Sequence, residues 1–178
     1  MSGGTLTPPV GHGDHSQGRS DAPITLLEYG DFECSYCSLA YPLVKSMQQQ
    51  LGNKLRFVFR EFPLTEAHPH AQHAAEAAEA AAAHGKFWEM HDLLYEHQDR
   101  LGDSDLALYA KSAGLDADDM ARALKDGTLA APVRQQFMSG VRSGVNGTPT
   151  FFVNGVRFDG EWTDQDLFLE ALTGAADR

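Results

Sequence analysis

The sequence predicts an α/β protein in which a small sheet is interrupted by a block of helices. Short, apolar, β-rich runs lie near both ends of the chain, and between them the hydrophobic period changes to about 3.6 residues. The third observation is a Cys-X-X-Cys pair placed between the first predicted strand and the first predicted helix. A chain of 178 residues can bury a core without disulfide staples, so the cysteines are available for other roles.

The N-terminal part is predicted to run strand, helix, strand. Residues 1–23, rich in Gly, Ser, Pro and Asp, are expected to form an irregular arm. A buried strand is expected from Ile24 to about Tyr29, and "KLRFVFREFP" alternates as a second strand. Between them, "CSYCSLAYPLVKSMQQQLG" has apolar residues at helical spacing, with Pro42 expected to kink the helix.

The C-terminal part is predicted to run helices, hairpin, helix. The alanine-rich "AHPHAQHAAEAAEAAAAHG" opens about eighty residues of helical periodicity. Thr150–Val153 is then a predicted strand, Asn154-Gly155 is a strong hairpin signal, and Val156–Phe158 is expected to pair back. "TDQDLFLEAL" is a capped terminal helix, so the predicted order is β, α, β, helices, β, β, α.

The cysteines Cys34 and Cys37 are expected to form a reactive pair. The first turn of a helix presents unpaired N–H groups and the positive end of the helix dipole, which favour the thiolate of Cys34. Cys37 lies one turn later and is expected to be shielded, so Cys34 is the predicted nucleophile and Cys37 the resolving thiol. A structural disulfide is the competing hypothesis, but so short a loop constrains little of the chain.

Metal binding is the other alternative for this part of the chain. Zinc usually needs four ligands, and the chain has no third cysteine. His68, His70 and His73 in "AHPHAQH" form the only dense histidine group. We expect a polar helix start there and no metal ion.

The element order, the Cys-X-X-Cys pair and "NGTPTFF" together resemble the thioredoxin fold with an inserted helical domain. Over about residues 24–173 the chain is most similar to the DsbA family of thiol–disulfide oxidoreductases. The resemblance implies a thioredoxin-like domain of residues 24–64 and 145–178, with residues 65–144 as the inserted helical domain.

The resemblance also implies roles for residues outside the cysteine pair. Glu28, on the first strand six residues before Cys34, matches a buried acid that in this family lies under the cysteines and carries the proton of the resolving thiol. A solvated glutamate at a strand end is the alternative. Thr148-Pro149 matches the cis-proline that faces the pair, and the backbone of Thr148 could then bind an extended substrate segment. An ordinary loop proline is the alternative here.

The dipeptide Ser35-Tyr36, at the substrate-facing position, differs from the Pro-His pair of strongly oxidising DsbA proteins. It carries no cation, and Asp31 and Glu33 would oppose the Cys34 thiolate if they were close. Because a less stable thiolate makes a weaker oxidant, we expect a reduction potential between about −270 and −120 mV.

The expected function is disulfide exchange with protein thiols and disulfides, with no bound cofactor. A recycling partner is needed, and glutathione is one candidate. The alternatives are a glutathione-dependent enzyme of the kappa transferase or 2-hydroxychromene-2-carboxylate isomerase type, and a redox-sensing binding module. An intact cysteine pair argues against the first, and turnover would exclude the second.

The net charge of -11 would repel nucleic acid and anionic membrane surfaces, so neither is an expected partner. No run of about 20 apolar residues is present to span a bilayer, and the N-terminus lacks the features of a secretory signal. We therefore expect a cytoplasmic protein, or a periplasmic or secreted one if a signal peptide has been removed.

Overall fold

The computed structural model describes residues 3–176, and the chain divides into two compact units. The first unit, called here the sheet unit, comprises the described residues 3–30, 39–60 and 138–176. The second, the helical unit, comprises residues 31–38 and 61–137. The helical unit thus includes the Cys-X-X-Cys segment as well as most of the expected insertion. Residues 1–2 and 177–178 of the expected domains lie outside the described part.

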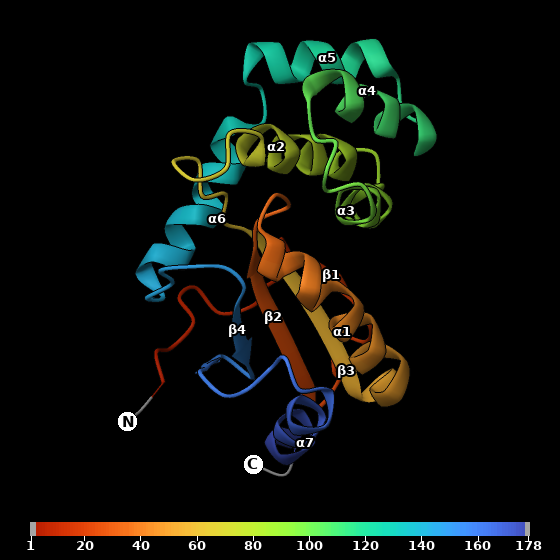
Figure 1. The fold of residues 1–178 in the computed structure, drawn as a ribbon. Helices are drawn as coiled ribbons and strands as arrows, with labels where there is room; N and C mark the ends of the chain where they lie inside the picture. The colour runs from red at the N-terminus through yellow and green to blue at the C-terminus, as the bar shows by residue number, and fades with distance from the viewer. Residues whose placement is uncertain (1–2, 177–178) are drawn as a thin grey trace. The chain divides into compact units, whose positions relative to one another are not determined.

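The sheet unit is built on five strands in the order β1-β3-β2-β4-β5 (Figure 1). Their bounds are β1 His15–Gln17, β2 Ile24–Gly30, β3 Leu55–Glu61, β4 Thr150–Val153 and β5 Val156–Phe158. β2 pairs antiparallel with β4, with Leu26 opposite Val153, and β4 pairs antiparallel with β5. The positive φ values of Asn154 and Gly155 form the turn that the sequence predicted.

The edge strand β1 is a difference from the sequence prediction. His15–Gln17 pair antiparallel with Phe57–Phe59 of β3, inside the segment for which an irregular arm was expected. These three residues have no apolar alternation that would have marked them as a strand. Their pairing depends on an edge of β3 that is distant in sequence, and it covers backbone groups that would otherwise remain unpaired.

Two helices accompany the sheet. α1 spans Ser35–Leu51 with Pro42 inside it, and its buried side chains include Ala40, Val44 and Met47. α7 spans Gln165–Ala176 and contacts β2. Aromatic side chains fill this core, as in the pair Phe151–Phe168, whose ring centroids are 5.3 Å apart.

The helical unit contains α2 Ala71–Ala82, α3 Phe87–Glu96, α4 Asp103–Ser112, α5 Ala117–Asp126 and the first part of α6 Ala130–Arg142. α2 buries six alanines, which allows close approach to α3, α4 and α5. Asp116 caps the start of α5, and its carboxylate accepts the N–H groups of Asp118 and Asp119. The mixed α/β fold with a helical insertion is confirmed.

Candidate functional site

The cysteines lie at the start of α1. The Cys34 carbonyl accepts the Ser38 N–H at 3.1 Å, which is the first bond of the helix, so Cys34 stands at its N-terminal boundary. Cys34 is 6% exposed and Cys37 is fully buried, while Ser35 and Tyr36 between them are exposed. Cys34 is less exposed than expected. Cys34 is nevertheless more accessible to solvent than Cys37.

The segment before Cys34 packs against helix α3 and is hydrogen-bonded to Gln98, which follows α3. Phe32 is fully buried and packs against Tyr95, with ring centroids 5.0 Å apart, and against His91 at 5.7 Å. The amide of Gln98 donates to the carbonyls of Phe32 and Cys34, both at 2.8 Å. These contacts explain why residues 31–38 belong to the helical unit and not to the unit that contains β2.

Asp31 is the hydrogen-bonding centre of this segment. It is 1% exposed, and its carboxylate accepts the N–H groups of Glu33 at 2.8 Å and Leu64 at 2.9 Å. The same carboxylate lies 2.8 Å from Nδ1 of His68. Its backbone carbonyl accepts the Cys34 N–H at 3.1 Å. One residue therefore joins the cysteine segment to the loop before α2.

His68 is a basic residue next to the cysteine segment, and its position there was not predicted from the sequence. Partial burial acts to lower the pKa of His68, but the hydrogen bond and charge of Asp31 outweigh burial. Smaller contributions from Cys34 and Glu33 also raise the pKa, which lies above the ordinary value of 6.5. Asp31 links the imidazole to the cysteine segment, because its carboxylate binds His68 and its carbonyl accepts the Cys34 N–H.

A second carboxylate–histidine pair runs beside the first. Glu33 accepts the His70 N–H at 2.7 Å and lies 2.9 Å from His70 Nδ1. Asp31 and Glu33 were expected to oppose the Cys34 thiolate if they were close to it, and the structure adds that each carboxylate has an imidazole partner. D-F-E and H-P-H have the same spacing, but only the fold brings the two motifs together. His73 lies apart, 2.6 Å from Asp103.

Glu61 is a second feature missed by the sequence analysis. It is fully buried at the end of β3, and neither carboxyl oxygen has a hydrogen-bond partner among the described residues. Burial, followed by the charges of Glu79 and Asp31, raises the pKa of Glu61 well above its ordinary value of 4.5. Its carboxyl therefore keeps its proton to a higher pH than an exposed glutamate does.

The other expected site residues belong to the sheet unit. Glu28 lies in β2 and is 2% exposed, so the alternative of a solvated strand-end glutamate is wrong. The Thr148–Pro149 peptide bond is cis and leads into β4. The approach of Glu28, Thr148 and Pro149 to the cysteine pair stays a prediction.

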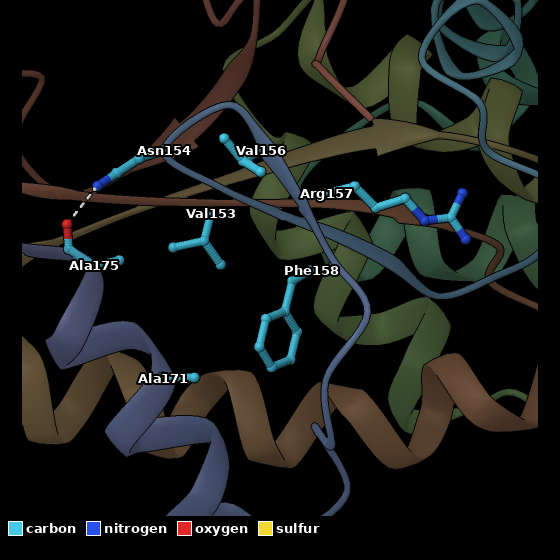
Figure 2. A pocket seen from close by; sticks show the side chains of 7 residues that line it. All are labelled: Val153, Asn154, Val156, Arg157, Phe158, Ala171 and Ala175. Carbon is cyan, nitrogen blue, oxygen red and sulfur yellow. Dashed lines mark hydrogen bonds between the residues drawn. The ribbon is translucent and has the colours of Figure 1, made fainter. Parts of the chain in front are cut away.

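The sheet unit also contains an apolar cavity of about 480 Å³ between the β4–β5 hairpin and α7 (Figure 2). Val153, Phe158 and Ala171 line it, and the Asn154 amide donates to the Ala175 carbonyl at 3.2 Å on one side. None of the seven described residues that line it is a cysteine, histidine or carboxylate. It offers none of the groups that thiol chemistry needs.

Within residues 3–176, no three or more His, Cys, Asp or Glu side chains are grouped so that they could bind a metal ion. Over the same residues, none of the helices combines the length and apolar character needed to cross a membrane.

A protein family matches most of this chain. The family described as Thioredoxin matches residues 11–171 of this chain. Among curated relatives, the Na(+)/H(+) antiporter NhaA 3 of Salinispora tropica is 48% identical over 162 residues, covering 91% of this chain and 24% of the relative. NhaA 1 of Mycolicibacterium vanbaalenii is 43% identical over 161 residues, covering 89% and 26%. The chain thus spans about a quarter of the length of the curated relatives it matches.

Solved structures match over nearly the whole chain. Oxidised BdbD from Bacillus subtilis has a TM-score of 0.87 at 22% identity, covering 100% of this chain and 98% of the other. A thioredoxin-like oxidoreductase from Silicibacter pomeroyi has a TM-score of 0.81 at 25% identity, covering 94% and 95%. The thiol-disulfide exchange protein α-DsbA2 from Wolbachia pipientis has a TM-score of 0.76 at 20% identity, covering 90% and 86%.

Proposed function

Because this chain belongs to the thioredoxin family and has the fold of DsbA-type thiol–disulfide oxidoreductases, we propose that it exchanges disulfides with protein substrates through Cys34 and Cys37. The observation that carries the proposal is the position of the pair: Cys34 retains some exposure at the start of α1, and Cys37 is fully buried one turn later. This arrangement gives the two thiols different access to a substrate.

The exchange proceeds in two steps. In reduction, the Cys34 thiolate attacks one sulfur of a substrate disulfide, which forms a mixed disulfide and releases the other substrate sulfur as a thiolate that takes up a proton. Cys37 then loses its proton and attacks the Cys34 sulfur. This attack releases the second substrate thiol and leaves the Cys34–Cys37 disulfide. Oxidation of a substrate dithiol is the reverse sequence.

A trapping experiment tests the division of labour between the thiols. Cys37→Ala should still attack substrate but fail to resolve, so mixed disulfides accumulate as dithiothreitol-sensitive bands on a non-reducing gel. Cys34→Ala should trap almost nothing, because the remaining thiol is buried. Adducts collecting on Cys34→Ala instead would reverse the assignment.

The sheet-unit residues have proposed roles in the same reaction. Glu28 is proposed to carry the proton of Cys37 during resolution, and its 2% exposure agrees with the buried acid that the resemblance implies. Thr148 and Pro149 are proposed to present backbone to an extended substrate, while Ser35 and Tyr36 contact it from the helix start. Glu28→Gln should slow resolution of the mixed disulfide more than its formation, as measured by rapid quenching.

Two alternative functions are open to a direct test. A glutathione-dependent enzyme would transfer or isomerise small electrophiles and would not need both cysteines. A redox-sensing binding module would not turn over. Catalysed insulin reduction that requires both Cys34 and Cys37 excludes both alternatives. If the native chain shows no turnover with insulin or with a reduced, unfolded protein, the proposed function fails.

The similarity to the antiporters is proposed to reflect a shared thioredoxin-fold segment, since only about a quarter of each antiporter is matched. The compartment is likewise a proposal. The expected cytoplasmic location competes with the periplasm, where one structural neighbour from Salmonella enterica is placed by its description. A potential near about −270 mV fits a reducing compartment and one near −120 mV an oxidising compartment.

A further inference from the structure

The cysteine pair lacks a charged neighbour within its own motif. Ser35 and Tyr36 are uncharged, and the two nearest residues with charge in the sequence, Asp31 and Glu33, are acidic. We propose that Asp31 positions His68 as an imidazolium beside Cys34, and that this cation stabilises the thiolate of Cys34. The inference rests on the proposed function, because it assigns what sets the redox properties of that pair.

The geometry supports a fixed position for His68. The carboxylate of Asp31 is itself held by the N–H groups of Glu33 and Leu64, so it has little freedom to turn. Its remaining bond, 2.8 Å to Nδ1, orients the imidazole ring and leaves Nε2 as the second donor of the cation. Asp31 acts only through His68 and is therefore a positioning residue.

The charge interaction with Cys34 acts in both directions. Asp31 connects the two groups, because its carbonyl accepts the Cys34 N–H at 3.1 Å and its carboxylate lies 2.8 Å from His68 Nδ1. After burial and the two contributions of Asp31, Cys34 also acts to raise the pKa of His68. A charge interaction is reciprocal, so an imidazolium that the thiolate stabilises also stabilises the thiolate. Without His68, the buried carboxylate of Asp31 would remain near the thiol with no cation to offset it, which would favour the protonated thiol.

His70 is a matched control supplied by the chain. It also binds a carboxylate through Nδ1, two residues further along both segments. The His70 side chain is 49% exposed and that of its partner Glu33 is 20% exposed, against 25% for His68 and 0% for Asp31. Solvent and salt therefore screen the His70 pair more strongly. An effect specific to His68 would not be reproduced at His70.

The consequences have a defined sign. A stabilised thiolate favours the reduced pair, so His68 makes the disulfide a stronger oxidant. Because its raised pKa keeps His68 cationic below that value, the effect is present at lower pH and is lost as the pH rises through the pKa of His68. The groups that face His68 are Asp31, Glu33 and Cys34, and Glu61 adds its charge to the surroundings of Asp31 only if it ionises.

The experiment compares His68→Gln, His70→Gln and His68→Lys with the native chain. Thiolate formation by Cys34 is followed by ultraviolet absorbance during a pH titration, in a Cys37→Ala background. In chains with both cysteines, equilibrium with glutathione is measured: the protein disulfide and two glutathione thiols give the protein dithiol and one glutathione disulfide. Glutamine can still donate to Asp31 but carries no charge, while lysine restores the charge without the imidazole.

We expect His68→Gln to move thiolate formation to higher pH and to lower the equilibrium constant for reduction by glutathione about three- to ten-fold, the range that corresponds to half to one pKa unit. His68→Lys should recover part of this loss, and His70→Gln should change neither quantity more than slightly. The native and His68→Gln chains should converge above the pH at which His68 loses its proton.

Unchanged titration and equilibrium in His68→Gln would overturn the inference while leaving the proposed function intact. Equal shifts in His68→Gln and His70→Gln would also overturn it, because the effect would not belong to one imidazole. If native protein shows the His68-dependent titration but no turnover with any protein substrate, the proposed function fails and the electrostatic assignment stands. Thermal unfolding of each variant identifies a chain that has failed to fold, and the pH dependence of the native chain then provides the test.

Discussion

Arg60 and Glu61 are consecutive residues at the end of β3, and both are buried. The two side chains differ in their hydrogen bonding. Arg60, in the sheet unit, is 3% exposed and its guanidinium makes five hydrogen bonds: to both carboxylate oxygens of Asp14, to the hydroxyl of Tyr29, and to the carbonyls of Pro8 and Pro9. Glu61, in the helical unit, is fully buried, and its carboxyl oxygens have no such partner among the described residues.

Of these two buried side chains, Arg60 stabilises the fold and Glu61 does not. A guanidinium with all its donors satisfied holds the N-terminal arm against the sheet and stays charged. A buried carboxyl without partners keeps its proton and costs stability once it must ionise. The unit that carries the cysteines therefore contains a carboxyl, that of Glu61, whose pKa is raised by burial and by the charges of Glu79 and Asp31.

The largest expected effect comes from removing the carboxylate that binds Arg60. Asp14→Ala leaves Arg60 buried without its carboxylate and should lower the free energy of unfolding by about 3 kcal/mol. Urea denaturation measures the loss, and thiolate formation by Cys34 should not change. Asp21→Ala, which breaks the solvent-exposed pair with Arg19, is the matched control and should have no measurable effect. An equal loss in both variants would contradict the structural role of Arg60.

Replacing Glu61 should have the opposite effect and raise the free energy of unfolding at about pH 8. The pKa of Glu61 is raised in the folded protein, so its contribution to stability is fully present below its unfolded pKa of about 4.3 and is lost as the pH rises through the folded pKa. Glu61→Gln removes this titration and should be more stable than the native chain at about pH 8, by about 1.4 kcal/mol for each unit of pKa difference.

Chemical denaturation across pH measures the effect of Glu61. Asp14 provides the contrast, because despite the opposing effect of burial, its bonds to Arg60 and Gly11 lower its pKa. Its contribution is present above about pH 3.9 and is lost as the pH falls through the folded pKa. Glu66→Gln, at an exposed position, is the control variant. A native chain whose stability does not fall above about pH 5 would show that Glu61 is not buried as a neutral acid.

The smallest expected effect concerns the Tyr29 hydroxyl, which is hydrogen-bonded to Arg60. The Tyr29 hydroxyl lies 3.0 Å from Arg60 Nη1 and 2.8 Å from the hydroxyl of Ser139. Tyr29→Phe keeps the ring and removes both bonds, so it should cost about 1 kcal/mol. The midpoint of urea unfolding measures this change. Tyr36→Phe, at a side chain that is 60% exposed, should leave the midpoint unchanged; a Tyr29→Phe midpoint equal to that of the native chain would mean that the Arg60 network does not depend on the hydroxyl.

Local sequence patterns were enough to predict most of the helices and strands and the position of the cysteine pair. Apolar periodicity predicted β3 and the helices, Asn154-Gly155 predicted the hairpin, and Cys34 was predicted at the start of α1. These features depend on residues close together in the chain, where side-chain period and turn chemistry act directly. The fold class followed from their order.

Which charged residues lie near the cysteine pair depends on the tertiary structure. Asp31 and His68 are 37 residues apart, and Asp14 lies 46 residues before Arg60. Strand β1 likewise exists because β3 offers it an edge. Whether a carboxyl is buried alone, as at Glu61, or joined to an imidazole, as at Asp31, depends on which distant groups the fold brings against it. Burial and neighbouring charge set a pKa, and no local sequence pattern encodes either of them.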